Sequence, residues 1–326
     1  MPRPVTLGIL SDIHYAGAAE QAYGPDYAHR AITNPLLRFL ARFYYHFIWV
    51  RNPLHLNHLL DRFLEQGVAF DYVIANGDYS CDCAALGVAD DAACQSAQEC
   101  LGKLRRQFGN KLRTVLGDHE LGKLSLVGER GGMRLASWRR AQQDLGLQPF
   151  WQLELGRYTL LGLTSSLVAL PVFEPETLPE ERSEWASLRK EHLVQINQAF
   201  QTLPARQRVL LFCHDPTALP FLWREEAIRA RLSQIEQTII GHLHSNLILW
   251  KSKLLSGMPA IHFLGPTGKR LSRALNQARY WRPFHVRLCP SLAGIELGRQ
   301  GGYCTAELDR EAVRPIRFRF HRLPRD

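Results

Sequence analysis

The chain has 326 residues, 46% of them hydrophobic, and a formal net charge of +9. This content is enough for a large core, and no linker, low-complexity run or internal repeat divides the chain. We therefore expect a single domain over 1–326, with insertions at about 15–70 and 121–207, rather than a string of modules. The charge fits an acidic partner, whether nucleic acid, a phosphorylated small molecule or an anionic membrane, without choosing between them.

Short apolar runs bounded by turn signals predict the strands, and helical patterns lie between them. The runs are rich in Val, Ile and Leu and do not alternate, which is typical of strands buried on both faces. The order is largely β-α-β, so we expect an α/β fold. Beyond about residue 256 the tail predicts short antiparallel strands at the end of one sheet. The predicted strands are 5–10, 72–76, 112–116, 158–163, 208–213, 236–240 and 260–264, and the predicted helices are 54–66, 90–107, 134–144, 180–202 and 222–234.

The seven cysteines indicate free thiols. Their number is odd, and the first residues enter a strand pattern without room for a signal peptide, so we expect a cytoplasmic protein. Cys81, Cys83, Cys94 and Cys100 lie close enough in sequence to raise a zinc site. Their spacing fits no standard zinc motif, and ordinary free cysteines are the better interpretation.

Five of the predicted strands end in side chains that can ligate a metal. Each piece is weak evidence by itself, since a polar pair after a strand is more often a helix cap, a turn or a half-buried histidine. Together they favour one site, because the carboxyl ends of strands form the ligand crevice of open α/β sheets. In chain order the residues are Asp12 and His14, Asp78, Asp118 and His119, His214 and Asp215, and His242 and His244.

In this order the motifs D-x-H, G-D, G-N-H-[DE], H and G-H-x-H resemble the signature of calcineurin-like metallophosphoesterases, over residues 12–244. The resemblance implies a four-layer α-β-β-α sandwich and a dinuclear metal centre. It assigns Asp12, His14, Asp78 and His244 to one ion, and the bridging Asp78 with Asp118, His214 and His242 to the other.

The chemistry explains the residue types. Two divalent ions about 3.5–4 Å apart clamp the attacking and leaving oxygens of a phosphoryl displacement, and they acidify a water. Imidazole and carboxylate ligands suit Mn²⁺, Fe or Zn²⁺ better than Ca²⁺ or Mg²⁺, and we expect Mn²⁺. The resemblance implies that His119 holds no metal and acts as the catalytic residue, neutralising phosphoryl charge or protonating the leaving group. We therefore expect a metal-dependent hydrolase of a phosphoanhydride or phosphodiester.

Asp118 departs from the family pattern, which usually has Asn at this position. An ionised Asp gives the protein ligands three formal negative charges instead of two. We expect tighter retention of the ions and a weaker electrophilic pull on the substrate, unless nearby cations compensate.

A basic, aromatic-rich segment at 35–51 lies between the first two motifs. It is too short and too charged for a transmembrane span, and it has the character of an interfacial membrane anchor. A helix buried under the sheet fits the composition equally well. The arginines in the segment favour a peripheral contact with the inner face of the membrane.

A second basic region lies in the last third of the chain. The sequence "GPTGKR" at 265–270 lacks the full Walker spacing, so a nucleotide P-loop is disfavoured. We expect Lys269, Arg270 and Arg273 to contact a second phosphate of the substrate. A solvated loop is the alternative.

An apolar segment and extra cations beside a phosphoesterase site predict a phosphorylated small-molecule or lipid-linked substrate. Among calcineurin-like enzymes, the UDP-2,3-diacylglucosamine pyrophosphohydrolases of lipid A synthesis have this character, and the motifs here are similar. The expected products are UMP and 2,3-diacylglucosamine 1-phosphate. Open alternatives are a phosphomonoesterase, a cyclic-nucleotide phosphodiesterase, a nuclease and a non-catalytic scaffold. Nucleic acid is disfavoured because the aromatic residues cluster away from the basic tail.

Overall fold

The computed structural model describes residues 3–24, 27–29, 32, 34–122, 131–259, 272–298 and 301–324. Two five-stranded sheets form its centre, with the strand orders β10-β9-β1-β2-β3 and β4-β5-β6-β7-β8. The first sheet contains β1 (Val5–Leu10), β2 (Tyr72–Ala75), β3 (Leu112–Thr114), β9 (Gly302–Leu308) and β10 (Arg317–Arg322). The second contains β4 (Phe150–Leu155), β5 (Tyr158–Leu163), β6 (Arg208–Cys213), β7 (Ile235–Ile240) and β8 (Val286–Leu288).

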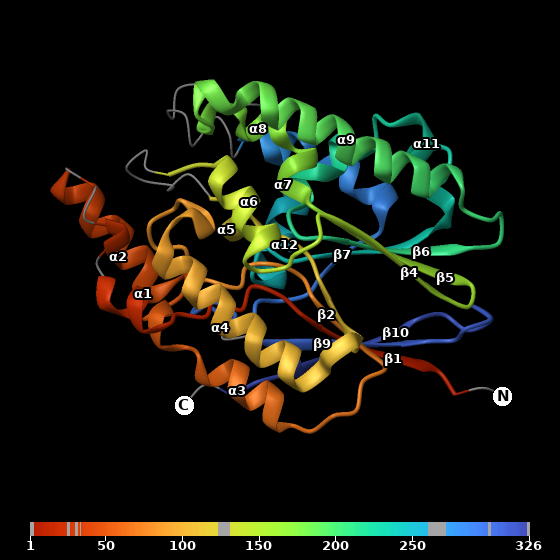
Figure 1. Ribbon diagram of the computed structural model, residues 1–326, viewed down its shortest axis with the longest axis horizontal. Coiled ribbons are helices and arrows are strands. Elements are labelled where there is room, and N and C mark those ends of the chain that lie inside the picture. The colour runs from red at the N-terminus through yellow and green to blue at the C-terminus, as the bar shows by residue number, and fades with distance from the viewer. Residues whose placement is uncertain are drawn as a thin grey trace.

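Helices cover the outer face of each sheet, so the layers run helix, sheet, sheet, helix (Figure 1). The predicted four-layer α/β sandwich is confirmed. The helices are α1 (Ala18–Tyr23), α2 (Pro35–Phe47), α3 (His58–Glu65), α4 (Asp91–Phe108), α5 (Asp118–Leu121), α6 (Leu135–Gln143), α7 (Ser165–Val168), α8 (Leu170–Phe173), α9 (Arg182–Gln201), α10 (Leu219–Leu222), α11 (Glu226–Arg229) and α12 (Asn246–Leu254).

Burial on both faces explains the unbroken apolar strands. Alternate residues of β1, such as Leu7 and Ile9, pack between the sheets against residues of the second sheet that include Leu210 and Phe212. The opposite face of the first sheet packs on α3 and α4, and that of the second on α9. Because side chains alternate along a strand, a strand between a sheet and a helix must be apolar on both sides.

Six of the seven predicted strands are confirmed, as β1, β2, β3, β5, β6 and β7. The seventh, 260–264, lies outside the described residues. The tail is confirmed as antiparallel, since β9 pairs with β1 and β10 with β9. The strands β4 and β8 were not predicted. In β4 the polar residues Gln152 and Glu154 interrupt the apolar signal at a sheet edge, and β8 has only three residues.

Four predicted helices, at 54–66, 90–107, 134–144 and 180–202, are confirmed as α3, α4, α6 and α9, with small changes at their ends. The continuous helix predicted at 222–234 is wrong. Within that range only Leu222, which ends α10, and Glu226–Arg229 are α-helical, and a 3-10 turn follows at Leu232–Gln234. The chain must reach Ile235, which pairs with Val209 on β6. Strand pairing therefore overrides the local helical preference.

Candidate metal centre

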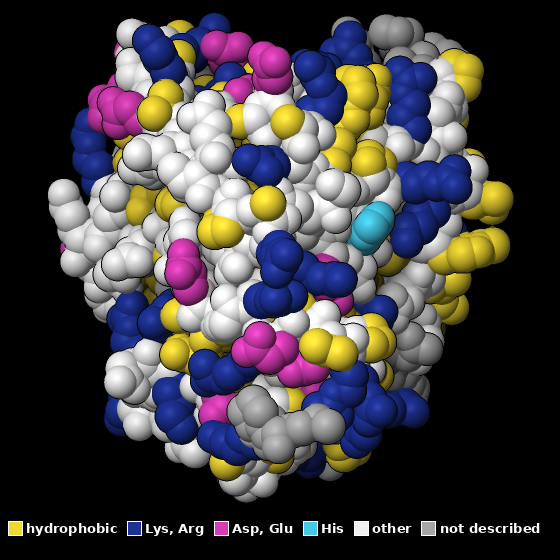
Figure 2. Space-filling view, turned by 90° about the vertical axis from the view of Figure 1, so that its right-hand side faces the viewer, with side chains coloured by type: hydrophobic (Ala, Val, Ile, Leu, Met, Phe, Trp, Pro, Cys, Tyr) yellow, Lys and Arg dark blue, Asp and Glu magenta, His cyan; other side chains and the backbone are white. Residues whose placement is uncertain are grey.

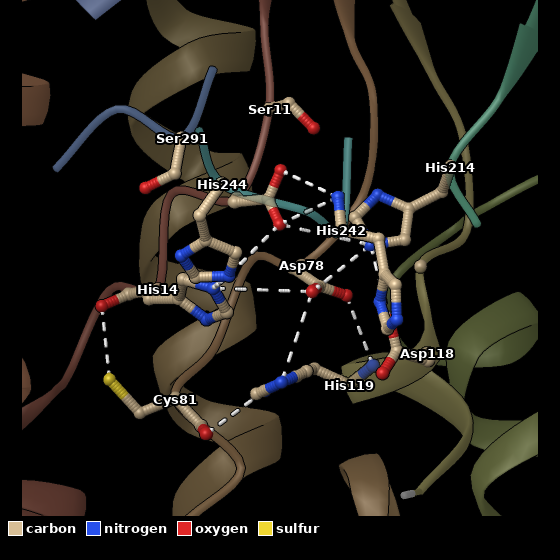
Figure 3. A network of polar contacts seen from close by, with 12 residues as sticks. Ser11, His14, Asp78, Cys81, Asp118, His119, His214, His242, His244 and Ser291 are labelled. Carbon is tan, nitrogen blue, oxygen red and sulfur yellow. Dashed lines mark hydrogen bonds and ion pairs between the residues drawn. The ribbon is translucent and has the colours of Figure 1, made fainter. Parts of the chain in front are cut away.

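The carboxyl ends of β1, β2 and β3 in the first sheet meet those of β6 and β7 in the second. Short turns after these strands bring all seven predicted ligands into one largely buried cluster, together with His119 (Figure 3). The predicted residues therefore converge although some of them, such as His14 and His244, are 230 positions apart in the chain. Both sheets contribute, so neither sheet alone could form the site.

One group of ligand atoms comes from Asp12, His14 and His244. The Nε2 atoms of His14 and His244 are 3.2 Å apart, and Nε2 of His244 is 3.3 Å from Oδ1 of Asp12. Nitrogen and oxygen atoms this close, facing one another, match the donor set that the resemblance assigned to the first ion.

A second group comes from Asp118, His214 and His242. Oδ1 of Asp118 is 3.2 Å from Nε2 of His214 and 2.9 Å from Nδ1 of His242. Asp78 lies between the groups, with Oδ2 3.1 Å from Nε2 of His214 and 4.0 Å from Nε2 of His14. The carboxylate of Asp118 thus lies beside the two imidazoles of its group, and that of Asp78 lies between the two groups.

The residues fit two divalent cations. Nε2 of His214 is fully buried and makes no hydrogen bond among the described residues, although two carboxylate oxygens lie within 3.2 Å. Its other nitrogen, Nδ1, donates to the carbonyl of Asn76 at 2.5 Å. That bond orients the ring, so that the neutral imidazole presents its Nε2 lone pair to the cluster, as metal-binding histidines usually do when a carbonyl accepts from the other ring nitrogen. Nδ1 of His14 faces the Ser80 carbonyl at 3.3 Å in the same way.

The backbone of the ligand turns is strained. Five of the seven predicted ligands have left-handed φ angles: Asp12 (51°), His14 (48°), Asp78 (60°), His242 (59°) and His244 (56°). Each such residue costs ~1–2 kcal/mol, and strain of this kind concentrates at functional sites. A left-handed residue redirects the chain sharply. These residues therefore turn the neighbouring polar side chains toward one point.

Two glycines are required by close approach. A Cβ at Gly117 would overlap the carboxylate of Asp78, and a Cβ at Gly241 would overlap Ser11 Oγ and the carboxylate of Asp12. The glycines that precede the ligand turns therefore make room for the ligands themselves.

Glu120 has a positioning role that the sequence analysis did not assign. Its fully buried carboxylate accepts hydrogen bonds from the backbone N–H groups of Asp78 (3.0 Å), Tyr79 (2.7 Å) and Gly117 (2.8 Å). It thereby ties the turn after β2 to the turn after β3. Burial and the charge of Asp78 raise the pKa of Glu120 to about 8, against the effect of the three N–H donors. Glu120 lies three residues after Gly117, the N-cap of α5, and this spacing, which lets a Glu side chain accept from the N-cap N–H, was the available signal.

Charge in the cluster is strongly coupled. Burial raises the pKa of Asp12 to about 6, although His214 acts in the opposite direction. Burial and Asp118 also raise the pKa of Asp78, but the His214 and His119 imidazoles outweigh them and hold it well below its usual range. Burial lowers the pKa of His214, but Asp78 and Asp12 raise it well above normal. Buried carboxylates need positive charge close by, which divalent cations supply.

His119 lies at the rim of the two groups. Nδ1 donates to the Cys81 carbonyl at 3.0 Å, so Nε2 is the atom that faces the centre, 3.9 Å from Oδ2 of Asp78. Asp215, which also follows β6, is 4.0 Å from Nε2 of His242 and caps the next turn through Thr217.

Arg273 is the one predicted substrate contact among the described residues, and it is not part of this cluster. Lys269 and Arg270 lie outside the described residues. Arg273 is exposed, and no hydrogen bond or ion pair joins it to another residue in the described part of the chain. A different residue reaches the centre instead: the Trp49 ring packs on His244, with centroids 4.6 Å apart.

No protein-family model and no curated protein matches this chain. Among solved structures, the chain is similar to a dimetal phosphatase from Danio rerio, with a TM-score of 0.47 and 13% sequence identity over 94% of this chain and 93% of that chain. Similarity at this level carries no argument about function, which depends on the side chains described above. Those side chains form a donor set for two adjacent divalent cations, the arrangement by which metal-dependent phosphoesterases act.

Proposed function

We propose that this protein is a dinuclear metal-dependent phosphoesterase. The observation that carries the proposal is the pair of three-residue donor groups on either side of Asp78. Bound there, two divalent ions would polarise a phosphoryl group and supply an acidified water. Mn²⁺ is our preferred metal, because mixed imidazole and carboxylate ligands suit it.

The chain's own residues hold and orient the reacting groups. Asn76 and Ser80 carbonyls fix the imidazoles of His214 and His14, so that these side chains need no rearrangement when a phosphate arrives. His119 is the proton donor in this proposal. Its Nδ1–H is held by the Cys81 carbonyl, and a proton on Nε2 can pass to the leaving oxygen.

The proposed substrate is UDP-2,3-diacylglucosamine, cleaved by water at its pyrophosphate to UMP and 2,3-diacylglucosamine 1-phosphate. Helix α2 supports an amphiphilic substrate. Large apolar side chains on it face solvent, including Leu36 (66% exposed), Phe39 (63%) and Phe47 (57%), and its only buried residue is Ala41. In Figure 1, α2 projects from one side of the molecule. The alternative of a helix buried under the sheet therefore does not fit this chain.

Helix α2 is also close to the metal centre. The backbone carbonyl of Trp49, just beyond its end, accepts a hydrogen bond from the Glu296 N–H at 2.6 Å, and the Trp49 ring contacts that of His244. We propose that α2 contacts the membrane surface and presents acyl chains beside the metals. Among the described residues no helix is long and apolar enough to cross a bilayer, so this contact would be interfacial.

The test is hydrolysis of UDP-diacylglucosamine in detergent micelles with added Mn²⁺, with UMP measured as product. Bis-p-nitrophenyl phosphate tests the metal chemistry separately, against an EDTA control. Activity on neither compound would favour a non-catalytic scaffold. Faster release of phosphate from simple monoesters would keep the phosphoesterase and overturn the lipid substrate.

A further inference from the structure

A cavity of about 840 Å³ lies away from the predicted ligands, beside the edge strand β8 of the second sheet and the edge strand β10 of the first. Residues of α12 and of the 3-10 helix Ala278–Phe284 complete its wall. No metal-centre residue lines it. Its size is within the range of small-molecule sites, which are about 300–1,000 Å³.

The wall of this cavity is strongly cationic. Among the described residues no Asp or Glu lines it, and no ion pair neutralises any of its five cations. These cations are Lys253, Arg279, Arg282, Arg287 and Arg319. Five unpaired positive charges around one hollow attract multivalent anions, and arginine in particular matches phosphate oxygens. In Figure 2, Lys and Arg side chains also predominate over Asp and Glu on the face that is drawn.

The same wall offers apolar and aromatic surface. Phe318 lies under the guanidinium of Arg287, 4.4 Å from the ring centroid, and Phe320 is 43% exposed. The Trp281 side chain, 5% exposed, lines the cavity, and its buried indole N–H has no hydrogen-bond partner among the described residues. A buried donor of this kind is costly unless a ligand or water accepts its hydrogen bond.

We propose that this cavity is a second binding site, separate from the metal centre, for an organic anion with two or more phosphate groups and a flat or apolar portion. A nucleoside diphosphate has this chemistry. The arginines would hold the phosphates, and Phe318 and Phe320 would contact the flat portion. A phosphorylated lipid headgroup shares the multiple phosphates, and the experiment separates the two sources.

The first test is calorimetric titration of the metal-loaded protein with ADP at low salt. We expect Arg279→Gln/Arg282→Gln/Arg287→Gln to weaken ADP binding about tenfold or more, because three charge-assisted contacts are lost. The matched control is Arg106→Gln/Arg182→Gln/Arg206→Gln, which removes the same charge from exposed positions without ion pairs among the described residues. Equal weakening in both triple variants, or none in the cavity variant, would overturn the site.

ADP could also bind at the metal centre, so the Asp78→Asn variant is titrated in parallel. If Asp78→Asn still binds ADP, the result supports a separate site. If Asp78→Asn loses ADP binding while the cavity variant keeps it in full, the result contradicts a separate site. Phe320→Ala should weaken the binding of ADP but leave the binding of inorganic pyrophosphate unchanged. Unchanged ADP binding would refute the role of the flat portion.

The lipid source is tested with phosphatidylcholine vesicles, with and without phosphatidylinositol bisphosphate. Binding that requires the phosphorylated lipid and the three arginines would support the site and place its phosphates on a lipid. Wild-type protein that binds neither ADP, pyrophosphate nor these vesicles would end the proposal.

Discussion

The metal centre and helix α2 are neighbours that differ in almost every physical respect. The ligands of the metal centre are largely buried, strained and held by backbone carbonyls and amides. Helix α2 buries only Ala41 and leaves its large apolar side chains in solvent. The first region has its geometry fixed by the fold, whereas the second has an apolar surface for which the described chain provides no cover. The difference separates the candidate metal site from the helix proposed to contact the substrate and the membrane, and the two regions meet at Trp49.

The largest expected effect is at the residue between the two donor groups. Asp78→Ala should abolish binding of both ions. Activity should fall by more than about 100-fold, which is the upper end of the loss when a residue that only orients a metal ligand is replaced. Metal analysis of the purified variant measures the loss of ions, and kcat/KM for bis-p-nitrophenyl phosphate measures the loss of activity. Glu191→Gln, which neutralises an exposed carboxylate on α9, is the control. Full activity in Asp78→Ala would show that the metal chemistry does not depend on Asp78.

A smaller effect is expected at Asp118, which touches one donor group only. Asp118→Ala should lose one metal equivalent, while Asp118→Asn should keep the fold and at least some activity, because an amide oxygen still ligates. Metal analysis of both purified variants decides. Two ions retained in Asp118→Ala would refute Asp118 as a ligand.

Substitutions on α2 should separate the two regions. Phe43→Glu/Phe47→Glu should reduce liposome flotation about tenfold or more, because two exposed apolar side chains become charged. Metal content and hydrolysis of bis-p-nitrophenyl phosphate should not change. The control is Val194→Glu/Val313→Glu, which alters exposed apolar residues outside α2. It should float with liposomes to the same extent as the wild type. If both pairs behave alike, α2 is not the membrane contact.

The smallest effect concerns a buried histidine outside the metal centre. His192 accepts a hydrogen bond from the Thr164 N–H at 3.2 Å, and burial lowers its pKa to about 4. Between pH 6.5 and 4 the unfolded chain binds this proton and the folded chain does not, so stability falls as pH falls, by about 3 kcal/mol at most. His214, equally buried, shows the opposite pKa shift because carboxylates surround it.

The variant His192→Gln keeps a hydrogen-bond acceptor at this position, but its side chain does not bind a proton between pH 6.5 and 4. Its melting temperature should therefore fall less than that of the wild type across this pH range. A difference between the two proteins that does not vary with pH would contradict the buried neutral imidazole.

Much of the site was predictable because its signals are local. Apolar runs identified six strands, and each ligand follows its strand within a few residues, so the turns after the strands were readable one by one. The pattern could not show that Glu120 ties two of those turns together, since its partners come from a neighbouring strand.

The sequence by itself determined six of the strands, the types of the candidate ligands and their places at strand ends, because periodicity and turn chemistry act over a few residues. Only the tertiary structure decided that two sheets share the centre, that the large apolar side chains of α2 are exposed, and that cations from α12, β8, β10 and the 3-10 helix Ala278–Phe284 surround one cavity. Those features depend on contacts between segments far apart in the chain, whose pairing is set by packing of the whole core and leaves no mark in any one segment.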